Sequence, residues 1–565
     1  MHDRSLPVAL AVCLSAAAGL PSSLSHAQGV AAGNPVDLLP APVQLPQPAA
    51  PAATIDTQPA PAPTAQQVPV TPLRFEIEGV KSIPFEEVAA LFAPFAGKPT
   101  TVAKLAETAR QATALYQQRG YALSFVYVPQ QDFRNGAARV VAVEGFIDKV
   151  SIDGDAGGAA PKLLALAERI RADRPLRLEV FERYTQLMAQ LPGVKVQANA
   201  QPPASTDGAG AMVLKVVREP YTVSASTDIR SSRLRAVVTG NLNDPMASGS
   251  RLSASTLVGD IDNETFVSAA YTQMLGSDGL VLKAEMSLYK GDPDAHFDNP
   301  PPIRRYTTYK RAELSLQYPL KLTRSESLNL SGGVYGVNNV DDYSNPANGI
   351  TLNDEVNSRA VFVQAAYNKA EPTQARTLVL RLARGIDGLG ATSGITTNGP
   401  GPTPVNPARL DFTRVLLEGS QRNRWGKTWG TAFSFSTQYS GDVLPSSERI
   451  SFGGNRFGRA YASGEVSGDK GWGVGAEVNF AVPVGMKYLK QVQPYLLVEA
   501  ARVSRNGLSL TFDSLQSASV GLRLTDSKYY SLDVALSKPV GDASPNNPSR
   551  DLRASTMLSY SLGQK

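Results

Sequence analysis

Residues 265–290 read TFVSAAYTQMLGSDGLVLKAEMSLYK, and this stretch decides the fold. Apolar and polar residues alternate along much of it, on both sides of the short polar segment 276–279. Alternation places apolar side chains on one face of an extended strand and polar side chains on the other. Glycine and aspartate favour a turn. The stretch therefore predicts two strands joined by a turn, each with one apolar face and one polar face.

The same pattern recurs from Tyr221 to the C-terminus, over about 345 residues. Fifteen alternating segments are found there, and RLRAVVTGNLND (233–244) is the candidate for a sixteenth. A water-facing β-sandwich would show similar alternation. A barrel with apolar residues toward lipid and polar residues toward a lumen fits so long a run better. We therefore expect residues 220–565 to form an all-β transmembrane barrel of about sixteen antiparallel strands, with room for an aqueous channel.

The N-terminus has the pattern of a secretory signal peptide, which we place at residues 1–27. An apolar run from Val8 to Leu20 follows a short charged start and precedes a cleavage pattern that ends at Ala27. The run is too short for a membrane anchor. A lipoprotein signal at Cys13 is a weaker alternative, because it would truncate the apolar run.

Composition excludes several kinds of chemistry. Removal of the signal peptide removes the only cysteine and leaves His296 as the only histidine. Thiol catalysis, disulfides and Cys/His zinc sites are then excluded, and a Ser-His-Asp triad is disfavoured. The net charge of +5 comes from 55 basic and 50 acidic residues without a basic block, which disfavours nucleic-acid binding. We predict no enzyme activity, no catalytic residue, no metal site and no cofactor.

Residues 28–71 are rich in proline and alanine, which predicts an extended linker. Helical periodicity begins after it. Residues 72–147 read as a strand, two helices and two strands, and residues 148–219 repeat that order. We therefore expect two small α+β domains between the linker and the barrel.

This architecture resembles the outer-membrane transporters of two-partner secretion (TpsB), the hemolysin-activator family ShlB/FhaC/HecB. The first α+β unit resembles a polypeptide-transport-associated (POTRA) domain, through FEIEGVKSIP and the stretch from KPTTVAKL to VVAVEGFIDKV. The resemblance rests on a set of residues placed as in such domains: Tyr116, Gly120, Tyr121, Pro129, Gln130, Gly136, Glu144 and Gly145.

A second motif lies in FGGNRFGRAY, residues 452–461. It resembles the family's Gly-Gly-x-x-Ser-Val-Arg-Gly-Tyr/Phe motif, which lies at the tip of an extracellular loop that folds back into the barrel. The match keeps Gly453, Gly454, Arg459 and Tyr461 but differs at Phe457, Gly458 and Ala460.

The resemblance also implies a partner for the motif arginine. The family pairs that arginine with an aspartate in a Phe-x-Asp-x-Gly pattern on the barrel wall. Leu497, Glu499 and Ala501 stand at those positions here, so we expect a bidentate pair between Arg459 and Glu499. The family often has a plug helix before its POTRA domains, and the proline-rich 28–71 segment does not predict one.

The resemblance implies a pore that receives an unfolded exoprotein (TpsA-like) in the periplasm and moves it across the lipid bilayer of the outer membrane. No GxxxxGK[ST] motif is present, so we expect export without nucleotide hydrolysis. The alternatives are a barrel-assembly insertase, a passive porin and an outer-membrane hydrolase. Two N-terminal domains argue against the insertase, and the porin would give those domains no task. The scarcity of histidine argues against the hydrolase.

Overall fold

A computed structural model of the chain describes residues 34–40, 53–55, 67–133, 135–203, 205–229, 235–259, 262–293 and 303–562. The predicted signal peptide, much of the linker and His296 lie outside these ranges. None of the described helices has the length and apolar character needed to cross a membrane.

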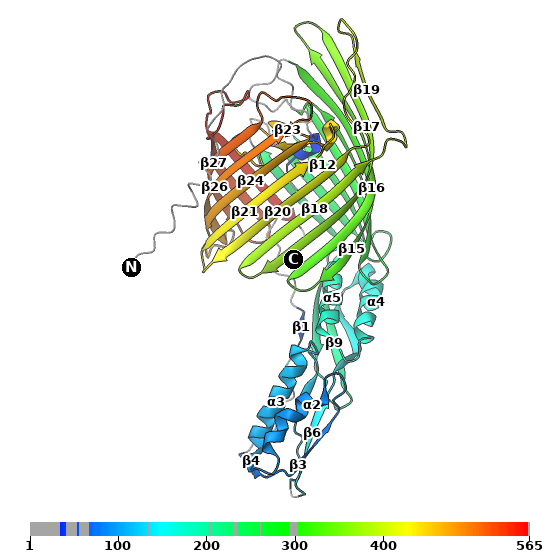
Figure 1. The fold of residues 1–565 in the computed structure, drawn as a ribbon, viewed down its shortest axis with the longest axis vertical. Helices are drawn as coiled ribbons and strands as arrows, with labels where there is room; N and C mark the ends of the chain where they lie inside the picture. Colours follow the sequence, from blue (N-terminus) through cyan, green and yellow to red (C-terminus); the bar gives the residue numbers. More distant parts are fainter. Residues whose placement is uncertain are drawn as a thin grey trace, which may run out of the picture. The chain divides into compact units, whose positions relative to one another are not determined.

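The N-terminal region contains two α/β units, each with the order β-α-α-β-β (Figure 1). In the first, β3 pairs parallel and β5 antiparallel with the central strand β6. In the second, the sheet order is β1-β8-β9-β7. The first unit consists of β3 (Arg74–Glu78), α2 (Phe85–Phe92), α3 (Val102–Gln118), β5 (Phe125–Tyr127) and β6 (Ala137–Val143), with the short β2 (Pro69–Val70) and β4 (Thr100–Thr101) beside it. The second consists of β7 (Phe146–Gly154), α4 (Ala160–Arg171), α5 (Leu178–Ala189), β8 (Val194–Gln201) and β9 (Ala209–Arg218), with β1 (Thr54–Ile55) at its edge.

Helix α3 shows how the sequence specifies these units. Thr101 caps the helix, because its side chain accepts a hydrogen bond from the Lys104 amide at 3.2 Å. Leu105, Ala109 and Tyr116 recur at helical spacing and are buried against the sheet. The cap fixes where the helix begins, and the buried face fixes how the helix packs on the sheet.

The C-terminal region is a closed antiparallel barrel in which β10 pairs with β29. β19 (Thr392–Thr397) lies beside β17, and the two-residue β25 (Val482–Pro483) pairs with β26 next to β24. Apart from these two segments, the described part of the barrel consists of sixteen strands, which confirms the expected fold class. They are β10 (Tyr221–Ile229), β11 (Arg235–Asn243), β12 (Ser250–Val258), β13 (Glu264–Leu275), β14 (Leu280–Gly291), β15 (Arg304–Leu322), β16 (Glu326–Asn345), β17 (Ile350–Glu371), β18 (Gln374–Gly385), β20 (Thr413–Trp425), β21 (Trp429–Tyr439), β24 (Lys470–Phe480), β26 (Gln491–Ser504), β27 (Ser514–Thr525), β28 (Tyr530–Pro539) and β29 (Arg553–Leu562).

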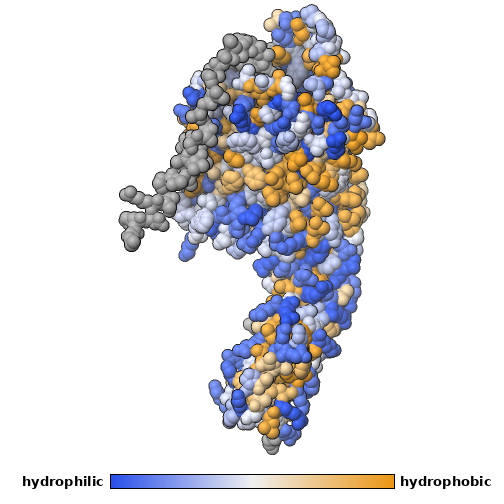
Figure 2. Space-filling model, in the orientation of Figure 1, coloured by the Kyte–Doolittle hydropathy of each residue, from blue (hydrophilic) through white to orange (hydrophobic). Residues whose placement is uncertain are grey.

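Alternation along the strands separates the two faces of the barrel wall. In β26, Tyr495 is 3% exposed, Leu496 64%, Leu497 9% and Val498 57%. Large apolar side chains therefore point outward, where lipid would cover them. Figure 2 shows them as a band across the wall formed by β15 to β18, with polar side chains on both sides of the band.

The lumen contains chain from two distant parts of the sequence. One part is a hairpin between β21 and β24. The other is the 3₁₀ helix η1 (Pro35–Leu38; Figure 1, blue). Its Val36 and the following residue Leu39 pack against buried lumen residues. The sequence of residues 28–71 does not predict a plug helix, and the part of this segment that lies in the lumen is a 3₁₀ turn rather than an α-helix. Asn34 caps the turn and Pro35 occupies its first position, where a missing amide proton is tolerated.

Candidate functional site: the hairpin inside the barrel

A short hairpin folds back into the lumen and carries the FGGNRFGRAY motif. Its strands β22 (Ile450–Phe452) and β23 (Val466–Gly468) pair antiparallel, and residues 453–461 lie between them. Apolar residues of the hairpin pack on the lumen face of β26 and β27. This cluster contains Ile450, Phe452, Ala460, Tyr461, Val466, Ala501, Val503 and Leu515. The hairpin is therefore packed against the wall along its length.

Gly453 occupies a conformation that other residues rarely adopt. Its φ is +120°, and a Cβ atom placed on it would lie 2.1 Å from the Ala462 carbonyl oxygen. Gly454 follows with φ of +62°. The left-handed geometry and the close approach of backbone to backbone explain why the motif needs glycine at its start. The turn then directs Arg459 toward the wall.

Arg459 is 9% exposed and reaches two wall residues. Its Nη1 lies 3.3 Å from Asp533 Oδ1 on β28, and it also donates to the Tyr495 hydroxyl on β26. Tyr495 in turn donates to Asp533 Oδ1 at 2.6 Å. The prediction that the guanidinium forms a bidentate pair with Glu499 is therefore wrong in its partner.

Glu499 does lie at the hairpin tip, but it binds the backbone. Its Oε2 accepts hydrogen bonds from the amides of Gly458 (3.2 Å) and Arg459 (2.8 Å) and from Ser517 Oγ (2.9 Å). All three donors bind the same carboxylate oxygen, and the arginine side chain extends past Glu499 to Asp533. Glu499 thus fixes the path of the tip, while Arg459 joins the tip to a different strand.

The Arg459 contact belongs to a lumen network of two cations and two anions. Arg523 on β27 binds Asp533 at 3.0 Å and makes a bidentate pair with Glu477 on β24, at 2.7 and 2.6 Å. Balanced charges with paired hydrogen bonds are the arrangement in which buried ions are tolerated. Asp533 was missed in the sequence analysis. The pattern that could have revealed it is YSLDVALSKP, residues 530–539. In this strand Asp533 lies between Leu532 and Val534, which point outward, so the aspartate points into the lumen.

Two other motif residues bind elsewhere. The Tyr461 hydroxyl donates to the Gln516 carbonyl oxygen at 3.1 Å. Arg456 does not reach the network. Its guanidinium bridges Glu418 of β20, at 2.9 Å, and Asp37 of the N-terminal segment, at 3.1 Å. The hairpin therefore contacts both the wall and the segment that shares the lumen with it.

In the first α/β unit, Glu144 organises the motif residues. Its carboxylate accepts hydrogen bonds from the amides of Lys81 (2.8 Å) and Ser82 (2.6 Å), from Ser82 Oγ (2.8 Å) and from the Tyr116 hydroxyl (3.0 Å). Burial alone would raise the pKa of Glu144, but the hydrogen bonds from Ser82 and Lys81 outweigh it and hold that pKa below its usual 4.5. One side chain thus joins α3, β6 and the segment after β3.

Two glycines of this motif form the connection to the second unit. The carbonyl of Gly120 accepts a hydrogen bond from Leu178 at 2.7 Å, and that of Gly145 accepts one from Leu176 at 2.9 Å. A Cβ atom on Gly145 would lie 2.4 Å from the Leu123 carbonyl oxygen, so glycine is required there. The two α/β units are therefore bonded through backbone at both positions.

The remaining motif residues lie nearby. The amide of Tyr121 donates to the Tyr116 carbonyl at 2.9 Å, and its ring packs edge-on against the Tyr116 ring. Pro129 ends the segment after β5. Gln130 is exposed, whereas its neighbour Gln131 bonds Arg139 of β6 through both of its amide atoms, at 2.8 and 2.7 Å. The glutamine that fixes this turn is therefore Gln131.

Glu144→Gln is expected to destabilise the first α/β unit by roughly 1–2 kcal/mol at neutral pH, because charge-assisted hydrogen bonds are lost. The folded pKa of Glu144 is lowered, so its stabilisation is present above 4.5 and is lost as the pH falls through the folded value. Hydrogen exchange of β6 amides in the full chain measures this, as protection relative to the intrinsic rate at each pH.

The control is Glu78→Gln, since the Glu78–Arg139 ion pair is about half exposed on both sides. Exposed pairs contribute little, so protection of β6 should change by less than about 0.5 kcal/mol. The outcome that would contradict this is a difference in β6 protection, between wild type and Glu144→Gln, that stays constant from neutral pH to well below 4.5. Such a result would show that the charge of Glu144 does not stabilise the unit.

Comparisons with known proteins agree with this geometry. Residues 70–145 match the family described as "POTRA domain, ShlB-type", and residues 357–524 match "Haemolysin secretion/activation protein ShlB/FhaC/HecB". No curated protein sequence matches the chain.

Three solved structures share the fold. CdiB from Escherichia coli is 17% identical, with a TM-score of 0.64 over 90% of this chain and 93% of its own. CdiB from Acinetobacter baumannii is 15% identical, with a TM-score of 0.57 over 92% and 95%. BamA from Haemophilus ducreyi lacking POTRA domains 1–3 is 14% identical, with a TM-score of 0.53 over 88% and 100%.

Proposed function

Because this chain belongs to the ShlB/FhaC/HecB family of haemolysin secretion/activation proteins, we propose that it is the membrane pore of a two-partner secretion system. It receives one unfolded exoprotein on the side of the α/β units and passes it through the barrel lumen to the other side. We infer from the barrel and the POTRA-type unit that the protein lies in the bacterial outer membrane, with the α/β units in the periplasm. We assign it no catalytic residue.

The observation that carries this proposal is the occupied lumen of a closed barrel. The hairpin tip and the segment 34–40 lie inside it, and both are held there by noncovalent contacts, namely ion pairs and apolar packing. A passive porin needs an open lumen, so it would not need the hairpin and the segment 34–40, which Arg456 joins to each other inside this barrel. A pore for an extended chain needs its lumen closed at rest and open during passage.

We place the first movement of opening in the N-terminal segment. Asp37 binds Arg456, and both side chains remain about 30% exposed. The hairpin, in contrast, buries Phe452, Tyr461 and Arg459 against the wall. Partly exposed ion pairs contribute little stability, whereas buried groups are costly to expose. An arriving chain therefore displaces residues 34–40 more readily than it displaces the hairpin.

The α/β units would bind the arriving chain through the edges of their sheets. β5 is an edge strand of the first sheet and β7 an edge strand of the second. Strand addition to such an edge uses backbone hydrogen bonds, which gives affinity with little dependence on sequence. We propose the domain limits accordingly: residues 1–27 are the signal peptide, 28–71 the linker, 72–147 and 148–219 two POTRA domains, and 220–565 the barrel.

The second candidate is a barrel-assembly insertase, which the shared fold with BamA favours. That BamA structure lacks three POTRA domains and so comes from a protein with more of them than the two α/β units described here.

For the proposed secretion pore, the energy for export would come from folding of the exported chain outside the cell.

Deletion of the gene in its own bacterium separates the two candidates. Loss of one large surface or secreted protein, restored by the wild-type gene, is the expected result. Mass spectrometry of the outer-membrane fraction and the medium measures it. A general fall in outer-membrane barrels with unchanged secretion would instead establish the insertase.

A further inference from the structure

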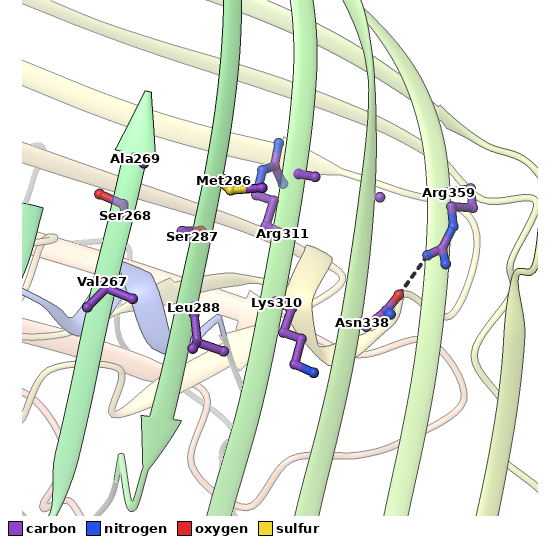
Figure 3. A pocket seen from close by; sticks show the side chains of 12 residues that line it. Val267, Ser268, Ala269, Met286, Ser287, Leu288, Lys310, Arg311, Asn338 and Arg359 are labelled. Carbon is purple, nitrogen blue, oxygen red and sulfur yellow. Dashed lines mark hydrogen bonds between the residues drawn. The ribbon is translucent and has the colours of Figure 1, made fainter. Parts of the chain in front are cut away.

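The outer face of the barrel carries a groove of about 610 Å³ across five adjacent strands, β13 to β17 (Figure 3). Buried Tyr289, Tyr309 and Tyr335 point into the lumen, so the residues next to them in sequence point outward. The outward side chains of the groove are Val267, Ala269, Met286, Leu288, Lys310, Ala312, Asn338 and Arg359. Its floor is apolar, and two cations stand at one side of it.

The two cations are not neutralised within the groove. Arg359 donates to Asn338 Oδ1 at 2.9 Å (Figure 3). It also donates to the carbonyl oxygens of Val337 and Ser358, so all three acceptors are uncharged. None of the described residues that line the groove carries a carboxylate. Lys310 pairs with Asn338, whereas Arg359 pairs with Gly336, so the two cations lie two strands apart and two residues out of register. Their Cα atoms are then about 12 Å apart. Both can reach an anion placed over the intervening strand β16.

The position of the cations along the barrel identifies the membrane level. Outward Leu314, Leu316 and Leu320 of β15 continue from the groove toward the turn after Leu322. That end of the barrel contacts the second α/β unit, since Arg183 donates to the Pro319 carbonyl at 3.0 Å. Lys310 therefore lies at the far border of the apolar band. With the α/β units in the periplasm, this border belongs to the outer leaflet.

We propose that this groove binds a phosphorylated lipid of the outer leaflet, with its phosphate between Lys310 and Arg359 and an acyl chain over Val267, Met286 and Leu288. The inference rests on the proposed membrane orientation but not on export. Cations at a membrane surface attract anionic headgroups, and the guanidinium fork suits phosphate oxygens. The apolar floor distinguishes the lipid from a free anion, because only the lipid also covers hydrocarbon surface.

The test uses the full-length protein in detergent and bis-phosphorylated lipid A as the probe, with binding measured by native mass spectrometry. The double variant Lys310→Gln/Arg359→Gln is expected to weaken binding about thirtyfold, because two headgroup contacts are lost. The matched control is Lys369→Gln/Arg376→Gln, which removes two outward cations from β17 and β18 at the opposite border. This control should bind like wild type.

Further arms separate the sources of phosphate. Dephosphorylated lipid A should bind wild type no better than it binds the double variant. Inorganic phosphate at the same concentration should not displace the probe. Equal binding of both lipids, displacement by inorganic phosphate, or an equal loss in the control would each overturn the proposal. Export by the double variant in cells reports on the proposed function separately, since neither residue faces the lumen.

Discussion

Arg459→Ala is expected to lower export of the secreted partner by about tenfold or more, while the barrel still folds and inserts. The guanidinium is buried and links the hairpin tip to Asp533 and Tyr495. Removing one member of a buried ion pair costs about 3–5 kcal/mol, because the other member is left without its partner. The wall network keeps Arg523 and Glu477 paired, so the barrel itself is retained. Secreted protein is measured by quantitative immunoblot, and folding by heat-modifiable migration of the barrel.

The control is Arg502→Ala, which removes an exposed arginine of β26 whose partner is Asp513. Export should not change. A double-mutant cycle then identifies the partner of Arg459. Arg459→Ala and Asp533→Asn should be strongly non-additive, because each breaks the same contact. Export at wild-type levels by Arg459→Ala would contradict the role of the hairpin. Additivity with Asp533→Asn would contradict the partner assigned here.

The barrel was predictable because its signal is local and repeated. A period of two residues reports which face of a strand is apolar, wherever the strand lies in the wall. The candidate for the sixteenth segment, 233–244, overlaps β11 for the same reason. The α/β units were predictable because helix caps and the change of period mark their elements. None of these inferences required knowledge of which residues, far apart in the sequence, contact each other.

Partners across the lumen were not predictable in the same way. Register places Glu499 opposite the hairpin tip, but an arginine side chain is long enough to pass it and reach β28. Which acceptor it uses depends on what else occupies each carboxylate, and at Glu499 that is the hairpin backbone. Asp37 and Arg456 are 419 residues apart in sequence. Proline density correctly argued against an α-helix near residue 37, but it left a 3₁₀ turn possible.

The second large effect is expected when residues 34–40 are fixed inside the barrel. Asp37 of the segment and Glu418 of the wall both contact Arg456, so cysteines at these two positions lie close enough for a short bifunctional thiol reagent. The only native cysteine, Cys13, lies in the predicted signal peptide, so no competing thiol is expected in the mature chain. Cross-linking Asp37→Cys/Glu418→Cys should reduce export to background, because the segment and the exported chain need the same space.

The reagent contains an internal disulfide, so reduction should release the segment and restore export. Each single-cysteine variant treated with the same reagent controls for the modification itself. The rate of export from cells carrying the cross-linked double variant, measured before and after reduction, tests the claim that the path runs through this lumen. The account predicts arrest followed by recovery. Export that continues at the wild-type rate while the segment is held against β20 would contradict it.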